Sequence, residues 1–125
     1  MKREILFRGK RIDNGEWVKG FFYGINAVND HIGYIGFVTA AKYNVIPETI
    51  GQFTGLTDKN GVKVFEGDII NHYAMSGYII YENGMFLMSN NTNSQFCDCK
   101  QPFAYHDVTE MEVISNIHDN KDFLK

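Results

Sequence analysis

IGQFTGLTDKNGVKVFEGDII, residues 50–70, is the stretch of sequence that decides the fold. Its middle, Asp58–Gly61, is a hairpin signal, because Asn and Gly tolerate the positive φ angles of a tight turn between strands. Its end, Glu66–Ile70, is typical of a turn that leads into a strand, with the Asp68 carboxylate accepting backbone N–H groups. The stretch therefore predicts a small β unit organised by closely spaced turns.

The dipeptide Asn-Gly occurs twice more, at Asn14-Gly15 and at Asn83-Gly84. Strand-forming residues flank each pair, and type I′ turns, which need positive φ at both central residues, are expected at all three sites. Three hairpin signals in 125 residues predict a meander of antiparallel strands.

A last strand is expected over residues 111–117. Alternation divides its side chains between two faces: Met111, Val113 and Ile117 on the apolar face, Glu112 and Asn116 on the polar one. No window sustains a helical apolar pattern over three turns. Only one-turn pieces are predicted, at residues 47–50, where Pro47 suits a first helical position, and at residues 119–124.

The fold class follows from these turns and from glycines inside strand-like runs, which let strands bend or approach closely. We predict a mainly β fold, in which antiparallel hairpins form a small SH3-like barrel with an N-terminal β-hairpin extension and only short helical turns. Residues 1–125 are expected to form a single domain, with sub-lobes at residues 1–48 and 49–125.

Composition narrows the class of protein. Hydrophobic residues make up 44% of the chain and aromatic residues 14%, which is enough for a packed interior. The net charge of −3 does not favour nucleic acid as a partner. Apolar runs are too short to span a membrane, and no apolar stretch follows the basic start as in a secretory signal. We expect a soluble, cytoplasmic protein.

Charge is distributed unevenly along the chain. Residues 1–25 carry six basic and three acidic side chains, a local balance of +3. Four of the basic residues lie near aromatic ones and are the candidate nucleic-acid contacts: Arg8, Lys10, Arg11 and Lys19. Alternation sends Phe21, Phe22 and Tyr23 to both faces of one strand, so at least one of them is expected to be exposed or in an interface. Self-association explains both features, and solvated strand faces also explain the charges.

No catalytic or metal site is predicted. Cys97 and Cys99 lie in a polar loop, residues 89–102, and lack the second ligand pair of a structural zinc site. A cluster of acidic side chains near His106 is the remaining candidate for Mg²⁺: Asp98, Asp107, Glu110 and Glu112. Its spacing matches no known chemistry, and the phosphate-binding and hydrolase motifs are absent. No cofactor is expected.

Four segments resemble the YopX family of phage and prophage proteins: Arg3–Arg8 (REILFR), Trp17–Gly20 (WVKG), Thr49–Ile69 and Val113–Asn120 (VISNIHDN). Ser115 stands where glycine is usual in the last of these. The resemblance implies a phage or prophage origin, a β-rich fold and homo-oligomers. It implies no established activity and no catalytic residues.

Three hypotheses of function follow. The first is a non-catalytic phage or prophage accessory protein that self-associates and binds a host or phage protein. The alternative is a nucleic-acid-binding module that uses the basic N-terminal hairpin. An enzyme or metal protein built on Cys97, Cys99 and the late acidic residues is the third and weakest reading.

Overall fold

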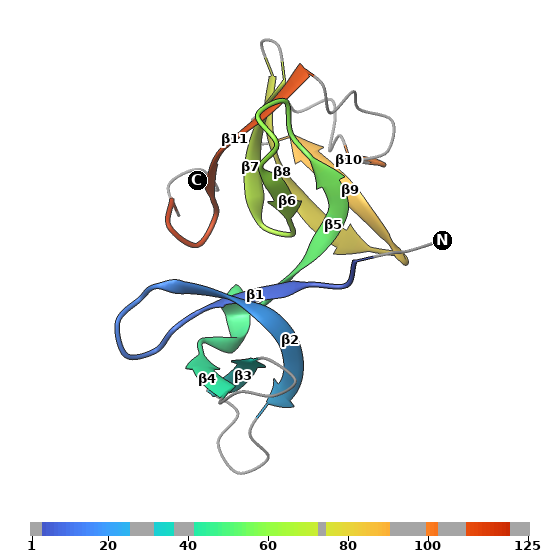
Figure 1. Ribbon diagram of the computed structural model, residues 1–125. Helices are drawn as coiled ribbons and strands as arrows, with labels where there is room; N and C mark the ends of the chain where they lie inside the picture. The colour runs from blue at the N-terminus through green and yellow to red at the C-terminus, as the bar shows by residue number, and fades with distance from the viewer. Residues whose placement is uncertain are drawn as a thin grey trace. The chain divides into compact units, whose positions relative to one another are not determined.

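The protein was analysed as a computed structural model, which describes residues 4–25, 32–36, 42–72, 75–90, 100–102 and 110–120. The chain divides into two compact units, Met1–Phe53 and Thr54–Lys125, called here the N-terminal and C-terminal units (Figure 1). The elements are, in chain order, β1 (Phe7–Lys10), β2 (Trp17–Ile25), β3 (Gly33–Gly36), β4 (Lys42–Val45), the 3-10 turn η1 (Pro47–Thr49), β5 (Gly51–Thr57), β6 (Lys63–Phe65), β7 (Asp68–His72), β8 (Met75–Glu82), β9 (Met85–Asn90), β10 (Lys100–Pro102) and β11 (Met111–Asn116).

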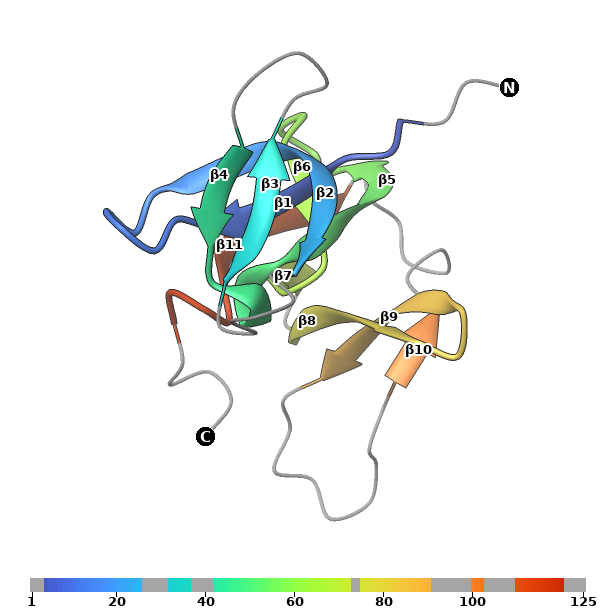
Figure 2. The ribbon, with the colours of Figure 1, turned by 90° about the horizontal axis from the view of Figure 1, so that it is seen from below.

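In the N-terminal unit, four consecutive strands pair as neighbours. β1 pairs antiparallel with β2, β2 with β3, and β3 with β4, and Figure 2 shows β2, β3 and β4 side by side. β4 then returns to the end of β1: the Ile12 N–H donates to the Asn44 carbonyl at 3.1 Å, and the Ile46 N–H donates to the Lys10 carbonyl at 2.9 Å. β1 also pairs with the start of β5. The predicted N-terminal hairpin is therefore part of a larger unit.

Two glycines allow the close approach of these strands. A Cβ at Gly20 of β2 would lie 2.4 Å from the Gly36 carbonyl oxygen of β3, which is closer than any side chain permits. A Cβ at Gly9 of β1 would lie 2.9 Å from the fully buried Val45 of β4. Gly9 and Gly20 thus occupy positions where the backbone itself is the packing surface.

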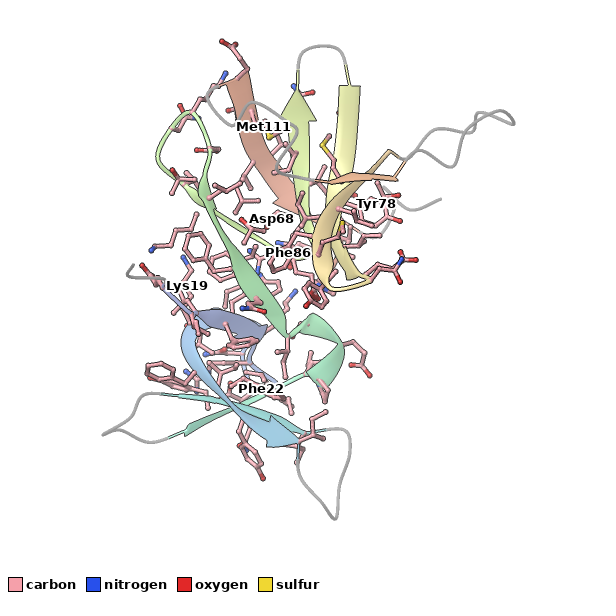
Figure 3. All side chains as sticks on the ribbon, turned by 90° about the vertical axis from the view of Figure 1, so that its right-hand side faces the viewer. Lys19, Phe22, Asp68, Tyr78, Phe86 and Met111 are labelled. Atoms are coloured by element: carbon pink, nitrogen blue, oxygen red, sulfur yellow. The ribbon has the colours of Figure 1, made fainter. Side chains whose placement is uncertain are left out.

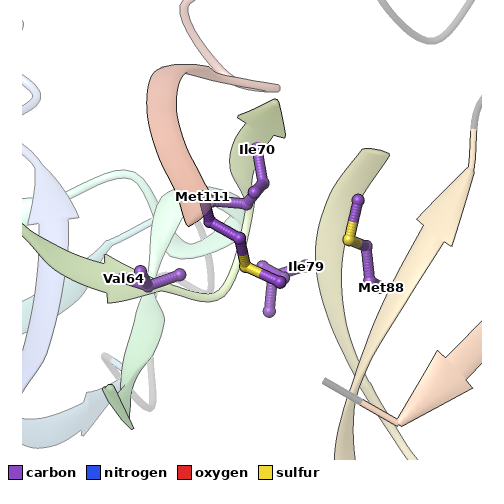
Figure 4. Packing of buried hydrophobic residues seen from close by; sticks show 5 residues of the cluster. All are labelled: Val64, Ile70, Ile79, Met88 and Met111. Carbon is purple, nitrogen blue, oxygen red and sulfur yellow. The ribbon is translucent and has the colours of Figure 1, made fainter. Parts of the chain in front are cut away.

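The C-terminal unit contains a five-stranded antiparallel sheet with the order β10-β9-β8-β7-β11. Five buried side chains form its apolar cluster (Figure 4): Val64, Ile70, Ile79, Met88 and Met111. They come from β6, β7, β8, β9 and β11, one from each of these five strands. Because burying a side chain of this size contributes about 1.5–3 kcal/mol, the cluster ties together segments that are distant in sequence.

One residue of the last strand, Asn116, does not lie on the polar face where it was expected. Asn116 is buried, with 9% of its surface exposed, and it pairs with Asp68 of β7. The cause is a register shift between Val113 and Ser115, which adds a residue to β11. A bulge of this kind reverses the faces of the residues that follow it. Ile114, the extra residue, is 53% exposed.

The type I′ turn is confirmed at one of the three Asn-Gly pairs. Asn83 and Gly84 both have positive φ, 55° and 78°, and they join β8 to β9 as a two-residue turn. At the other two pairs only the glycine is positive, Gly15 at 71° and Gly61 at 78°. The expectation of type I′ turns there is wrong, because both glycines lie in longer loops.

The mainly β class with antiparallel hairpins is confirmed. The short helical turn near residues 47–50 is present as η1, whereas most of residues 119–124 lie outside the described residues, as do Cys97 and Cys99. Strands β3, β4 and β10 were not predicted. β10 lies within residues 89–102, so the expectation of a loop there is wrong at its end, where Lys100–Pro102 pair with β9. No helix within the described ranges has the length and apolar character to cross a membrane.

Replacing Gly20 with alanine is expected to lower the free energy of unfolding by about 2 kcal/mol, because the new methyl group meets the Gly36 carbonyl and overpacking costs about 1–3 kcal/mol. Urea denaturation followed by the fluorescence of Trp17, which lies in the same unit, measures the change. The exposed neighbour provides the control, since Lys19→Ala should stay within about 0.5 kcal/mol of the parent. Equal stability of the two variants would contradict this reading of the β2–β3 contact.

Candidate functional site

The segment Thr49–Ile69, called here the family signature, contains polar side chains that make hydrogen bonds to the backbone. The Thr49 hydroxyl accepts from the Lys10 N–H at 2.9 Å and donates to the Ile46 carbonyl at 2.6 Å. The Thr54 hydroxyl donates to the Val64 carbonyl at 2.9 Å and accepts from the Leu56 N–H at 3.2 Å. Both threonines therefore join segments of one unit, and neither side chain is presented as a free reactive group.

Asp58 makes the most extensive of these connections. Its Oδ1 accepts from the N–H groups of Asn60 and Val62, at 2.8 and 2.9 Å, and its Oδ2 accepts from the Val113 N–H at 2.9 Å. The carboxylate is buried, with 6% of the residue exposed. The Lys59 N–H adds a bond to the Met111 carbonyl at 3.0 Å. The loop between β5 and β6 is thereby fixed to β11.

The charge state of Asp58 follows from this arrangement. Burial raises the pKa of its carboxyl group, but the three backbone N–H groups and the nearby Lys59 lower it by more. The pKa of Asp58 therefore lies below its ordinary value. The ionised form is the one that the fold requires.

A second connection joins the Glu66–Asp68 turn to the VISNIHDN segment. The Asp68 Oδ2 accepts from the Phe65 N–H at 2.7 Å, as the sequence predicts for this turn. Gly67, with φ at 92°, accepts from the Ile117 N–H at 2.9 Å, and a Cβ on it would lie 3.2 Å from the His118 Nε2. The Asn116 Oδ1 accepts from the N–H groups of His118 and Asp119. Each of these hydrogen bonds serves the fold.

The predicted basic residues are brought together in part. In the β1–β2 register, Arg8 is opposite Lys19 and Lys10 is opposite Trp17. Directly opposite residues share a face of the sheet, so Arg8, Lys10, Lys19 and Trp17 lie on one face. The Arg8 guanidinium carbon lies 4.7 Å from the centre of the Trp17 ring, and Arg8 itself is only 9% exposed. Lys10 and Lys19 thus flank a stacked Arg8–Trp17 pair.

Arg11, the fourth predicted basic residue, forms an ion pair with Asp13. Its Nε and Nη2 donate to the two carboxylate oxygens of Asp13, at 3.0 and 2.6 Å, and its guanidinium lies 4.9 Å from the centre of the Tyr43 ring. The hydrogen bond with Asp13 raises the pKa of Arg11, and the same bond lowers the pKa of Asp13. Because Asp13 neutralises it, Arg11 adds little to a phosphate-binding face.

A pocket of about 310 Å³ lies beside this ion pair, lined by Arg11, Ile12, Asp13, Ile32, Tyr43 and Asn44. Its size is at the lower end of the range for small-molecule sites. The pocket was not predicted, because it depends on β4, a strand that carries no turn signal of its own.

Exposed apolar side chains are the most distinctive surface feature. Phe21 and Phe22, adjacent on β2, are 45% and 41% exposed, and Ile25 at the end of the strand is 50% exposed. Phe22 and Lys19 project from the curved strand in Figure 3, and the Phe22 ring packs 5.7 Å from that of Phe7. The prediction that one residue of Phe21–Tyr23 is exposed is confirmed by two of them.

The late acidic residues do not assemble into a metal site within the part of the chain that the structure describes, where no group of three or more His, Cys, Asp or Glu side chains is placed to hold an ion. Glu112 instead lies 3.7 Å from the Lys59 Nζ, and Glu110 is exposed. The other members of the proposed cluster lie outside the described residues: Cys97, Asp98, Cys99, His106 and Asp107.

Comparison with known proteins bears on the signature. A family model described as YopX protein matches residues 7–125. The chain belongs to the YopX family. Among solved structures, this YopX-family chain is similar to the crystal structure of protein EF1440 from Enterococcus faecalis, with 25% identity, a TM-score of 0.54, and coverage of 99% of this chain and 100% of that one. Comparison with curated proteins gives no match.

Replacing Asp58 of this YopX-family chain with asparagine is expected to lower the free energy of unfolding at pH 7 by about 2 kcal/mol, since one carboxylate oxygen that accepts a buried N–H becomes a donor. The effect should depend on pH. Because the folded-state pKa lies below the unfolded value of about 3.9, the contribution of Asp58 is complete above that pH and is lost as the pH falls through the folded value.

Urea midpoints measured at pH 7 and near pH 3 test both statements. Asp13→Asn is the matched control, because Asp13 is an exposed carboxylate whose pKa is also lowered. The gap between wild type and Asp58→Asn should narrow at the lower pH and exceed that of the control at pH 7. If the difference in urea midpoint were the same at both pH values, the loss of stability in Asp58→Asn would come from altered hydrogen-bond geometry and not from the lost charge.

Proposed function

We propose that this chain is a non-catalytic phage or prophage accessory protein of the host cytoplasm, which self-associates and binds a host or phage protein. The observation that carries the proposal is the pair of exposed aromatic side chains, Phe21 and Phe22, on opposite faces of β2. Aromatic residues at the centre of an interface supply much of its binding energy. One ring is exposed on each face of the strand, with Ile25 beyond, so β2 offers apolar contacts suited to another protein.

The family signature supports binding rather than catalysis. Its carboxylates, Asp58 and Asp68, accept backbone hydrogen bonds, and this use in the fold is what favours binding over catalysis. The surface that would act is then outside the signature, on the strand where exposed apolar residues gather.

Strand edges contribute less to this proposal than exposed side chains do. The backbone at β4 is hydrogen-bonded to residues 10–12. In β11, the Met111 carbonyl accepts from the Lys59 N–H, and the Val113 N–H donates to the Asp58 carboxylate. Edges covered in this way are poor templates for an added strand. Association through the exposed apolar side chains of β2 (Phe21, Phe22 and Ile25) is the mode that we propose.

Replacing Phe21 and Phe22 together with serine is expected to convert the self-associated protein to monomer, because truncation of central aromatic anchors weakens an interface by about 2 kcal/mol or more each. Sedimentation velocity across a range of concentrations measures the change. Ile12→Ser is the matched control, since Ile12 is 47% exposed in the same unit but lies in the β1–β2 loop. Unchanged sedimentation of the double variant, with its circular dichroism preserved, would refute the proposed surface.

A nucleic-acid-binding function remains the second candidate, favoured by one observation: Lys10, Lys19 and the Arg8–Trp17 stack share a face. Basic side chains beside an aromatic ring are the elements of a single-strand site. Arg11, held by Asp13, leaves that set.

For this candidate, the variant Lys10→Glu, Lys19→Glu is expected to weaken binding of a single-stranded oligonucleotide. The dependence of log Kd on log salt should flatten by about 0.7 for each phosphate contact removed. Fluorescence anisotropy at several salt concentrations gives both quantities. Lys59→Glu, Lys63→Glu, in the C-terminal unit, is the control, because it changes the net charge by the same amount. Equal loss in the two variants would leave no specific role for the β1–β2 face.

A further inference from the structure

The three Asn-Gly pairs have the same local chemistry but different backbone environments. In such pairs, the backbone nitrogen of the glycine is a nucleophile that can attack the asparagine side-chain carbonyl carbon, because glycine has no side chain to hinder the approach. Asparagine is for this reason one of the thermolabile residues. All three asparagines, at positions 14, 60 and 83, are exposed to water.

Two of the three nucleophiles are engaged in hydrogen bonds. The Gly15 N–H donates to the Arg11 carbonyl at 3.1 Å, and the Gly61 N–H donates to the Asp58 carbonyl at 3.1 Å. The asparagines before them are also held: the Asn14 Oδ1 accepts from the Glu16 N–H, and the Asn60 N–H donates to the Asp58 Oδ1. Attack at either pair requires a native hydrogen bond to break first.

The third pair is different. In a two-residue type I′ turn, the N–H groups of the two central residues point outward, and the hydrogen bonds of the hairpin are made by the residues that flank them. Within the described residues, the Gly84 N–H has no acceptor and the Asn83 side chain has no partner. A Cβ on Gly84 would meet nothing within 4 Å, which is also true of Gly61, so the two pairs differ in their hydrogen bonds and not in the space around the glycine.

We propose that Asn83 is a site of spontaneous deamidation in the folded protein, in preference to Asn14 and Asn60. In mild base the Gly84 nitrogen loses its proton and forms a bond to Cγ of Asn83. The Cγ–Nδ2 bond breaks, and that nitrogen takes a proton from water and leaves as ammonia. Water then opens the succinimide ring at either carbonyl, which leaves aspartate or isoaspartate; one water is consumed and one ammonia is released.

Both products alter the tip of the β8–β9 hairpin. A new carboxylate appears next to Glu82, between the exposed side chains of Tyr81 and Met85, which are 54% and 45% exposed. Isoaspartate also adds one carbon to the backbone, so a two-residue turn with the angles of Asn83 and Gly84 can no longer form. The reaction changes the charge of an exposed apolar tip without any enzyme.

The test follows the deamidation of each pair by peptide mapping and mass spectrometry, with the full chain incubated at mildly alkaline pH. Since releasing one backbone hydrogen bond slows a reaction about fivefold, Asn83 should react at least about fivefold faster than Asn14 or Asn60 in the native protein. In concentrated urea, where the turns are lost, the three rates should converge.

Two matched variants complete the experiment. Asn83→Gly keeps a residue that accepts positive φ and should abolish the fast phase of ammonia release, whereas Asn14→Gly should leave that phase unchanged. A native rate at Asn14 or Asn60 equal to that at Asn83 would overturn the proposal. A preference for Asn83 that persists in urea would overturn it as well, because the preference would then come from sequence and not from the turn.

Discussion

The carboxylate of Asp58 is the constraint on which the C-terminal unit depends. It joins three backbone N–H groups from two segments that are 55 positions apart, and it does so from inside the protein, where an unpaired N–H is costly. The loop between β5 and β6 and the strand β11 are each incomplete without the other. A side chain that reads as a turn residue in the sequence therefore acts as a long-range connection in the fold.

That difference explains how much of the structure the sequence could predict. Local chemistry identified the turns at Asn83-Gly84 and at Gly67, because positive φ and an aspartate that caps its own turn are encoded within four residues. Local chemistry did not identify the hydrogen bond between Asp58 and Val113, because no sequence pattern near either residue indicates its partner. The buried position of Asn116 was missed for a similar reason, since a bulge is decided by pairing with β7 and not by alternation.

The sequence likewise predicted some features of the candidate surface and missed others. Adjacent aromatic residues at positions 21 and 22 must face opposite sides of a strand, so their exposure followed from the period of two. The basic residues looked equivalent in sequence, yet one stacks beneath Trp17 and another is neutralised by Asp13. Strand β4, which places Tyr43 against Arg11, has no turn signal, and its contribution to the surface could be found only by pairing. The family signature thus describes how the chain folds, and the exposed side chains outside it describe what the chain could bind.

The distance between Asp58 and Val113 along the chain also has a consequence for synthesis. A ribosome adds about 5–20 residues each second, so about 3–11 seconds separate the appearance of the carboxylate from that of the N–H that it will bind. The strands β1 to β4 find their partners within the first 53 residues and need not wait. Until β11 has been made, the edge of β7 that it will cover is unpaired. Other chains can therefore pair with this edge more readily during translation than in the finished protein.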